Sequence, residues 1–251
     1  MTDKVIVLTG ASRGLGAALA EALLAADTLL VTVSRKPNES LQKLARERGA
    51  QLLQIAADLS DPLKAVVGAE KVAAALPESA SSYALINNAG MVQPLALAPQ
   101  LTDGPAIASA FNLNVTAVIL LTARFLATTE GRARNRRILN ISSGAGRNPQ
   151  PSWGVYCATK AALDMYTRVL NAEQRANGVR AVSLAPGVVD TDMQASIRNS
   201  DPARVPVQPR FAELHARGQL SAPAQVAARI AAYLRRDDFG QAEIDDIRNY
   251  D

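Results

Sequence analysis

The stretch VIVLTGASRGLG, residues 5–16, decides the fold of this chain. Its aliphatic start predicts a buried strand, and three glycines, Gly10, Gly14 and Gly16, follow before an Ala- and Leu-rich helix at 17–26. Glycines in a strand-to-helix turn let the backbone come close to a phosphate and aim the amino end of the helix at it. The spacing G-x-x-x-G-x-G is one residue away from the common dinucleotide fingerprint, so the stretch predicts a dinucleotide-binding turn.

The rest of the chain repeats this alternation of short apolar runs and longer helical segments. Strands are expected at 5–8, 29–33, 52–55, 83–87, 137–141, 179–185 and 242–247, and helices at 17–26, 41–48, 62–76, 103–128, 152–176 and 223–235. Strands that are apolar on both faces and separated by helices indicate a parallel sheet covered on both sides. The sequence therefore predicts a single domain over 1–251, an α/β fold of the Rossmann type with a doubly wound parallel sheet of about seven strands.

The segment 190–220 interrupts the alternation with three prolines, several charges and weak periodicity. Ligands of open α/β sheets bind beyond the carboxyl ends of the strands, so an insertion after a late strand is well placed to cover a site. We expect a lid over the substrate here. The alternative is a surface loop without a function.

Composition excludes several classes of protein. The chain has 27 Lys and Arg against 23 Asp and Glu, a formal net charge of +4, and 48% hydrophobic residues, which excludes a disordered chain. A single cysteine, Cys157, excludes a disulfide scaffold. The charge is a weak field over this length and no run of Lys or Arg exceeds two residues, so we expect no nucleic-acid partner.

Residues 104–123 carry no charge, which raises the question of a membrane span. Six residues in this segment would need partners in hydrocarbon: Pro105, Ser109, Asn112, Asn114, Thr116 and Thr122. We therefore expect a buried helix and no membrane partner. The amino terminus lacks the pattern of a secretory signal, and one cysteine fits a reducing compartment, so the expected location is the cytoplasm.

Two arginines indicate which nicotinamide cofactor is bound. An NAD site places an acid about 20 residues beyond the glycine turn, whereas NADP needs a cation for its 2′-phosphate. Arg35 stands nineteen residues after Gly16, next to Ser34 at the end of the second expected strand, and Arg13 lies within the glycine turn. Two guanidinium groups can flank one phosphate, so the sequence predicts NADP(H).

Tyr156 and Lys160 are four residues apart on an expected helix, so the phenol and the ammonium share one face. A free tyrosine has a pKa near 10, and action at neutral pH needs a decrease of about 3 units, which a nearby cation and a charged nicotinamide could supply. Ser143 ends the fifth expected strand, where its hydroxyl could steady a carbonyl, whereas Ser142 points to the other face. Asn114 places an amide in an apolar helix, where it must find a partner or a water.

Together these motifs resemble those of the short-chain dehydrogenases/reductases of the single-domain type. They stand in the order of that family: Thr9-Gly10-x-x-x-Gly14-x-Gly16, Asp58, Asn87-Asn88-Ala89-Gly90, Asn114, Ser143, Tyr156-x-x-x-Lys160 and Pro186-Gly187-x-x-x-Thr191. The match spans the chain from Thr9 to Thr191. The combination is far more specific than any of its members.

The resemblance implies hydride transfer between nicotinamide C4 and a carbonyl or alcohol carbon. Tyr156 is then the acid/base, Lys160 holds the nicotinamide ribose and lowers the phenol pKa, and Ser143 binds the substrate oxygen. Asn114 would hold a water that feeds protons to Lys160. The implied cofactor-binding residues are Gly10, Ser12, Arg13, Gly14, Leu15, Gly16, Ser34, Arg35, Asp58, Leu59, Asn88, Ala89, Gly90, Tyr156, Lys160, Pro186, Gly187, Val189 and Thr191. No residue is assigned to a metal.

Within the family the chain is most similar to the branch of sepiapterin reductase and benzil reductase, which reduces bulky vicinal dicarbonyls with NADPH. The features behind this similarity are Arg35, the lid sequence Arg210-Phe211-x-x-Leu214-His215 and the ending Asp245-Asp246-Ile247. A bulky ketone or dicarbonyl, a small-molecule carbonyl compound, is the implied substrate. The apolar residues that could wall its pocket, with plain packing as the alternative for each, are Met91, Pro151, Trp153, Met193 and Phe211.

Two other functions remain open from the sequence. A 3-oxoacyl-carrier-protein reductase would use a cluster of arginines to meet its acidic carrier, namely Arg132, Arg134, Arg136 and Arg137. A non-catalytic NADP-binding sensor is the alternative of another class, and the intact set of four catalytic residues argues against it.

The expected helices at 103–128 and 152–176 are apolar nearly all round, so they should be buried on two sides. One side is the sheet. The family pairs these two helices across a two-fold axis, which implies a homodimer or a homotetramer.

Overall fold

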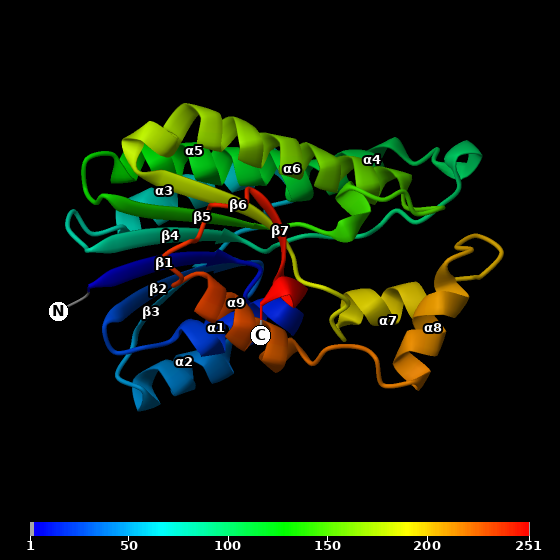
Figure 1. Ribbon diagram of the computed structural model, residues 1–251, viewed down its shortest axis with the longest axis horizontal. Coiled ribbons are helices and arrows are strands. Elements are labelled where there is room, and N and C mark those ends of the chain that lie inside the picture. Colours follow the sequence, from blue (N-terminus) through cyan, green and yellow to red (C-terminus); the bar gives the residue numbers. More distant parts are fainter. Residues whose placement is uncertain (1–2, 251) are drawn as a thin grey trace.

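The computed structural model describes residues 3–250, and within them seven parallel strands form one sheet in the order β3-β2-β1-β4-β5-β6-β7 (Figure 1). The strands are β1 (Lys4–Thr9), β2 (Thr28–Ser34), β3 (Gln51–Ala56), β4 (Ser82–Asn87), β5 (Asn135–Ile141), β6 (Val179–Ala185) and β7 (Ile244–Asp246). The chain starts in the middle of the sheet, builds outward to β3, and then crosses back past β1 to build the other half. This confirms the predicted doubly wound α/β fold.

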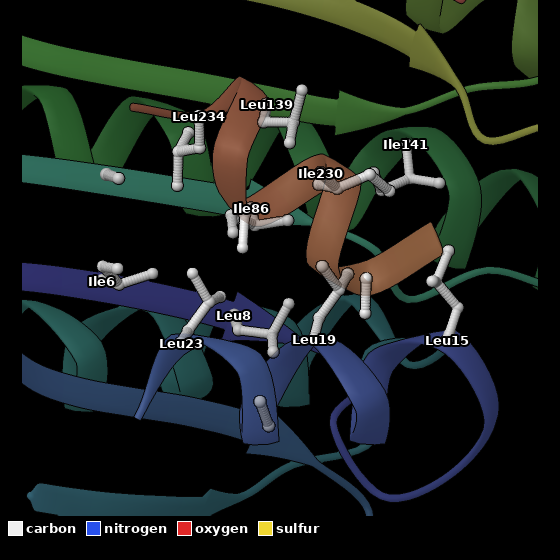
Figure 2. Packing of buried hydrophobic residues seen from close by; sticks show 14 of the residues in the cluster. Ile6, Leu8, Leu15, Leu19, Leu23, Ile86, Leu139, Ile141, Ile230 and Leu234 are labelled. Carbon is white, nitrogen blue, oxygen red and sulfur yellow. The ribbon is translucent and has the colours of Figure 1, made fainter. Parts of the chain in front are cut away.

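The alternation of side chains along β1 explains why helices cover both faces of the sheet. Ile6 and Leu8 face one side, where they pack against α1 (Gly14–Leu23) and α9 (Pro223–Tyr233) (Figure 2). Val5 and Val7 face the other side. The helices of that second layer are α3 (Pro62–Ala75), α4 (Gly104–Phe111), α5 (Ala117–Thr129) and α6 (Gly154–Gln174), and α2 (Glu39–Glu47) lies beside α1 (Figure 1).

The long helix expected at 103–128 is interrupted. A π-helical turn at Asn112–Thr116 separates α4 from α5, and the Asn114 side chain lies buried in it. π-Helical turns are rare in proteins, and many of those that occur lie at functional sites. With that turn included, the helical segment Gly104–Thr129 is long enough to cross a membrane and contains an 18-residue window with a mean hydropathy of 1.7. However, α5 packs against α3, and 33% of that window is buried.

The segment expected as a lid carries more structure than its weak periodicity predicted. It contains two short helices, α7 (Asp192–Arg198) and α8 (Gln208–Ala216), which contact each other. Both project beyond the carboxyl ends of the strands (Figure 1). The insertion therefore stands at the edge of the sheet where open α/β folds bind ligands.

Candidate active site

A cleft of about 500 Å³ runs along the carboxyl ends of the strands. Every cofactor-binding residue implied by the family resemblance lines it, from Gly10 in the first turn to Thr191 before α7, and Ser143 lines it as well. Asn114 does not. Sequence reasoning missed several lining residues, of which those on the lid are Asp192, Gln194, Ser196 and Ile197 and those elsewhere include Ser60, Gln93 and Leu113.

The glycine turn is held tightly against the end of β4. The Asn88 side-chain amide donates to the carbonyls of Thr9 at 3.0 Å and Gly10 at 3.4 Å, and the Thr9 hydroxyl accepts the Asn88 backbone N–H at 3.0 Å. Gly10 has a φ of +74°, and a Cβ on Gly16 would lie only 2.0 Å from the Gly10 carbonyl oxygen. A side chain at either position would therefore break a turn whose backbone leads into the amino end of α1.

The end of the cleft beyond β2 is cationic. Arg35 lies close enough to Asp58 to lower the pKa of its carboxyl group, although hydrogen bonds from the Ser60 hydroxyl and backbone N–H have the larger effect. Arg13 pairs with Asp192 of the lid at 3.3 Å, and both side chains are about 70% exposed. Because both side chains are exposed to solvent, this ion pair holds the Arg13 guanidinium only weakly.

The end of the cleft at β5 holds the candidate catalytic residues. Tyr156 and Lys160 lie one turn apart on α6, and both are buried. The Lys160 ammonium donates to the Ile141 carbonyl at 2.7 Å and lies 5.6 Å from the centre of the Tyr156 ring. Ser143 lies two residues beyond the end of β5, near enough to the phenol to lower its pKa. Strand end and helix thus bring a hydroxyl, a phenol and an ammonium together.

Burial controls the acidity of this group. It raises the pKa of Tyr156 to about 12, with the Ser143 hydrogen bond acting in the opposite direction, and it lowers the pKa of Lys160 to about 8. The predicted decrease of the phenol pKa depended on a bound nicotinamide as well as on Lys160; in the protein alone the loss of hydration raises this pKa instead. Tyr156 therefore stays protonated at neutral pH. The protonated phenol can donate a proton to the oxygen of a carbonyl group as that group is reduced.

The Asn114 side chain connects two segments that lie next to the candidate catalytic residues. Its amide nitrogen donates to the Met91 carbonyl at 2.9 Å and to the Thr159 hydroxyl at 3.0 Å, and its oxygen accepts the Met91 N–H at 2.9 Å. Both amide protons and one lone pair are therefore already used. The side chain ties the loop after β4 to α6 next to Lys160.

Aromatic residues form the wall beside the phenol. The Trp153 ring stacks on Phe211 of α8 with centres 5.4 Å apart, and its edge meets Tyr156 at 5.7 Å. Met91, Trp153 and Met193 line the cleft, whereas Phe211 packs behind Trp153. Pro151 is exposed and lies outside the lining, so the structure does not place it in the predicted pocket.

The arginine cluster lies around the start of β5, at the opposite edge of the sheet, where the strands begin. Arg132 donates to the carbonyls of Leu76 and Pro77, both at 3.1 Å, and Arg136 donates to the Asn177 carbonyl. Arg137 donates to backbone carbonyls after α9. A carrier protein docked on this cluster would face away from the cleft, so the arginines brace loops instead.

Comparison with known proteins agrees with this geometry. The family model for short chain dehydrogenases matches residues 4–202. A benzil reductase ((S)-benzoin forming) of Bacillus cereus is 35% identical over 96% of this chain and 98% of its own, and sepiapterin reductase of Bos taurus is 34% identical over 93% and 90%. A crystal structure from Beutenbergia cavernae that holds NADP at low occupancy superimposes with a TM-score of 0.81 and 26% identity, over 98% of this chain and 96% of its own.

The match covers most of the chain and includes both the glycine turn and the Tyr156–Lys160 helix. The chain therefore belongs to the short-chain dehydrogenase family and is an oxidoreductase that acts on CH–OH or carbonyl groups.

Proposed function

We propose that the protein reduces a bulky ketone or vicinal dicarbonyl compound with NADPH. The observation that carries the proposal is the position of Tyr156, which is buried next to Ser143 and Lys160 and in edge contact with the aromatic wall. A proton donor beside an apolar surface suits a large, flat carbonyl substrate better than a small polar one.

Each catalytic residue has one task. Tyr156 donates a proton to the carbonyl oxygen as the nicotinamide, when bound, supplies the hydride to the carbon. Ser143 donates a hydrogen bond to the same oxygen and fixes its position. Lys160 holds the nicotinamide ribose. Asn114 holds the loop after β4 in place, and the second lone pair of its amide oxygen is left to accept a hydrogen bond from a water in a proton relay.

The choice of NADPH over NADH rests on the cationic end of the cleft. Ser34, Arg35 and Arg13 line it, and no carboxylate follows β2 where an NAD site would need one. Asp58 is held by Ser60 and faces the adenine side. The NADP found in the Beutenbergia cavernae structure supports the same choice.

The substrate pocket is formed by Met91, Trp153 and Met193, and Phe211 supports it from the lid. The buried indole N–H of Trp153 has no hydrogen-bond partner within residues 3–250. The names of the relatives, benzil reductase and sepiapterin reductase, support a bulky ketone or dicarbonyl substrate.

We also propose that the protein is a homodimer or a homotetramer in solution. Four large apolar side chains of α4, α5 and α6 are more than a third exposed, namely Phe111, Ile119, Met165 and Val169. They lie on the side of these helices away from the sheet, and a second copy would cover them. Light scattering at micromolar concentration tests this, and a mass of one chain would contradict it.

The proposed activity is tested by the consumption of NADPH with a panel of carbonyl compounds. We expect turnover of benzil and related diketones and little turnover of acetoacetyl thioesters, because the arginine cluster does not face the cleft. The variant Tyr156→Phe is the control for background oxidation. If NADPH binds but no diketone, quinone or aldehyde is turned over, the protein is a sensor and the proposal is wrong.

A further inference from the structure

Asp164 is a buried carboxylate to which the proposed reaction gives no task. It lies one turn beyond Lys160 on α6 and is 7% exposed. One of its oxygens accepts the hydroxyl protons of Ser142 and Ser183, both at 2.6 Å, and the other accepts Nε of Arg147 at 3.0 Å. A carboxylate in such surroundings is costly unless it is paired, and here a single guanidinium pairs with it.

The hydrogen bonds of Asp164 lead to both ends of the catalytic group. Ser142 stands between Ile141, whose carbonyl accepts a hydrogen bond from the Lys160 ammonium, and Ser143, which lies near the phenol and lowers its pKa. Because Asp164 accepts the Ser142 hydroxyl, it fixes the end of β5. The contacts of Ile141 and Ser143 with the catalytic group depend on the position of this strand end. Because Ser183 belongs to β6, the same oxygen also joins β5 and β6 to α6.

Asp164 lies one turn after Lys160 on α6, so its negative charge acts on the ammonium. Two other titratable groups lie nearby: Tyr156 on the same helix, and Arg147, which follows the short helical turn after β5 and pairs with Asp164. The loop after β4 and the π-helical turn contribute the neutral Gly90 and Asn114. Burial lowers the Lys160 pKa, and the charge of Asp164 is the influence that raises it again.

We propose that Asp164 is a positioning residue of the catalytic group, which stabilises the Lys160 ammonium by its negative charge and holds the strand end Ile141–Ser143 against α6. Arg147 sets the strength of this effect, because it neutralises part of the carboxylate charge. The proposal rests on the proposed function in one respect, the binding of the nicotinamide ribose by Lys160.

The pH dependence of kcat/KM for NADPH tests the proposal, since this quantity reports groups of the free enzyme. In the wild type it should fall as pH rises through the Lys160 pKa of about 8. Asp164→Asn keeps the shape and removes the charge, so the midpoint should move down by about one unit. Arg147→Gln should move the midpoint in the opposite direction, because Asp164 then acts on Lys160 without compensation.

Asp245→Asn is the matched control. Asp245 is also a buried carboxylate, and it accepts the hydroxyls of Tyr233 at 2.8 Å and Tyr250 at 2.6 Å, but it touches Arg147 only through its backbone carbonyl. Loss of this charge should lower Tm and leave the midpoint where it is. A midpoint that stays unchanged in both the Asp164 and the Arg147 variants overturns the proposal.

A measurement without catalysis separates this proposal from the proposed function. The difference in Tm between the wild type and Asp164→Asn should shrink as pH rises from 7 to 9, because the ammonium that Asp164 stabilises is then lost. The difference for Asp245→Asn should stay constant. If the wild type turns over no carbonyl compound, the proposed function fails and the Tm curves still decide on Asp164. If Asp164→Asn does not fold, the direction of the Arg147→Gln shift decides.

Discussion

The buried ammonium of Lys160 should lower the free energy of unfolding of this protein, relative to an uncharged side chain at the same position. Burial lowers its pKa from 10.5 to about 8, which at 1.36 kcal/mol per unit corresponds to about 3 kcal/mol of unfolding free energy lost while the group is charged. Lys160→Met fills the same space without a charge but cannot donate to the Ile141 carbonyl, which costs about 1 kcal/mol. The variant should therefore unfold at pH 7 with a free energy about 2 kcal/mol larger than that of the wild type.

The pH dependence of this gain has a definite sign. The folded protein releases the Lys160 proton near pH 8, whereas the unfolded chain keeps it until about 10.5. Between these values the unfolded state binds more protons, so the stability of the wild type rises with pH. The advantage of Lys160→Met should therefore shrink from about 2 kcal/mol at pH 7 to about zero at pH 9.5. The raised pKa of Tyr156 affects stability only above pH 10, outside this window.

Urea unfolding at a fixed protein concentration, repeated at steps of pH from 7 to 9.5, measures this difference. Lys71→Met is the control, because Lys71 is exposed on α3 and its loss should change stability little at any pH. The same Lys160 variant should lose its reductase activity. The reasoning is refuted if Lys160→Met is less stable than the wild type at pH 7, or if the difference does not change with pH.

Three further variants address the site. Tyr156→Phe should lower kcat at least 100-fold because it removes the proton donor, while the Kd for NADPH, followed by nucleotide fluorescence, should change little since the ring remains. Arg35→Asp should weaken NADPH about 10- to 100-fold and leave NADH nearly unchanged, and an unaltered preference in the two titrations would remove our reason for choosing NADP. Gly16→Ala would put a Cβ 2.0 Å from the Gly10 carbonyl, so Tm and nucleotide affinity should both fall, whereas Gly104→Ala, where nothing lies within 4 Å of the new Cβ, should be harmless in a thermal melt.

The fold was readable because its signals are local. The run at 5–8 is apolar at every position, and the structure uses both faces of β1 for packing, as a strand inside a covered parallel sheet requires. The glycine turn was readable from the spacing of its glycines, although the contacts that exclude a Cβ at Gly10 and Gly16 include Asn88, which is distant in the chain. The break in the helix at 112–116 was not readable, because the apolar pattern runs through it. The bonds that Asn114 makes there, to Met91 and Thr159, join distant parts of the chain.

The sequence predicted which residues form the site, but it did not predict the electrostatic environment in which they lie. Spacing placed Tyr156 and Lys160 on one face of a helix, which the structure bears out, but spacing says nothing about how deeply that face is covered. The burial that raises the pKa of Tyr156 comes from side chains far away in the sequence, among them Val92, Ala145 and Phe211. An acidity inferred from Lys160 and a bound nicotinamide therefore left out the opposing effect of this burial.

The same dependence on packing explains why the sequence did not single out the carboxylate of Asp164 on α6. Asp164 follows Lys160 at the same four-residue step that led from Tyr156 to Lys160, so the sequence already held the pattern of a third group on that face. What gives the residue meaning is the packing of α6 on the ends of β5 and β6, which turns an ordinary helical acid into a buried one held by two hydroxyls and a guanidinium. A helix face that buries a lysine needs a compensating charge within reach, and on this helix the next turn supplies it.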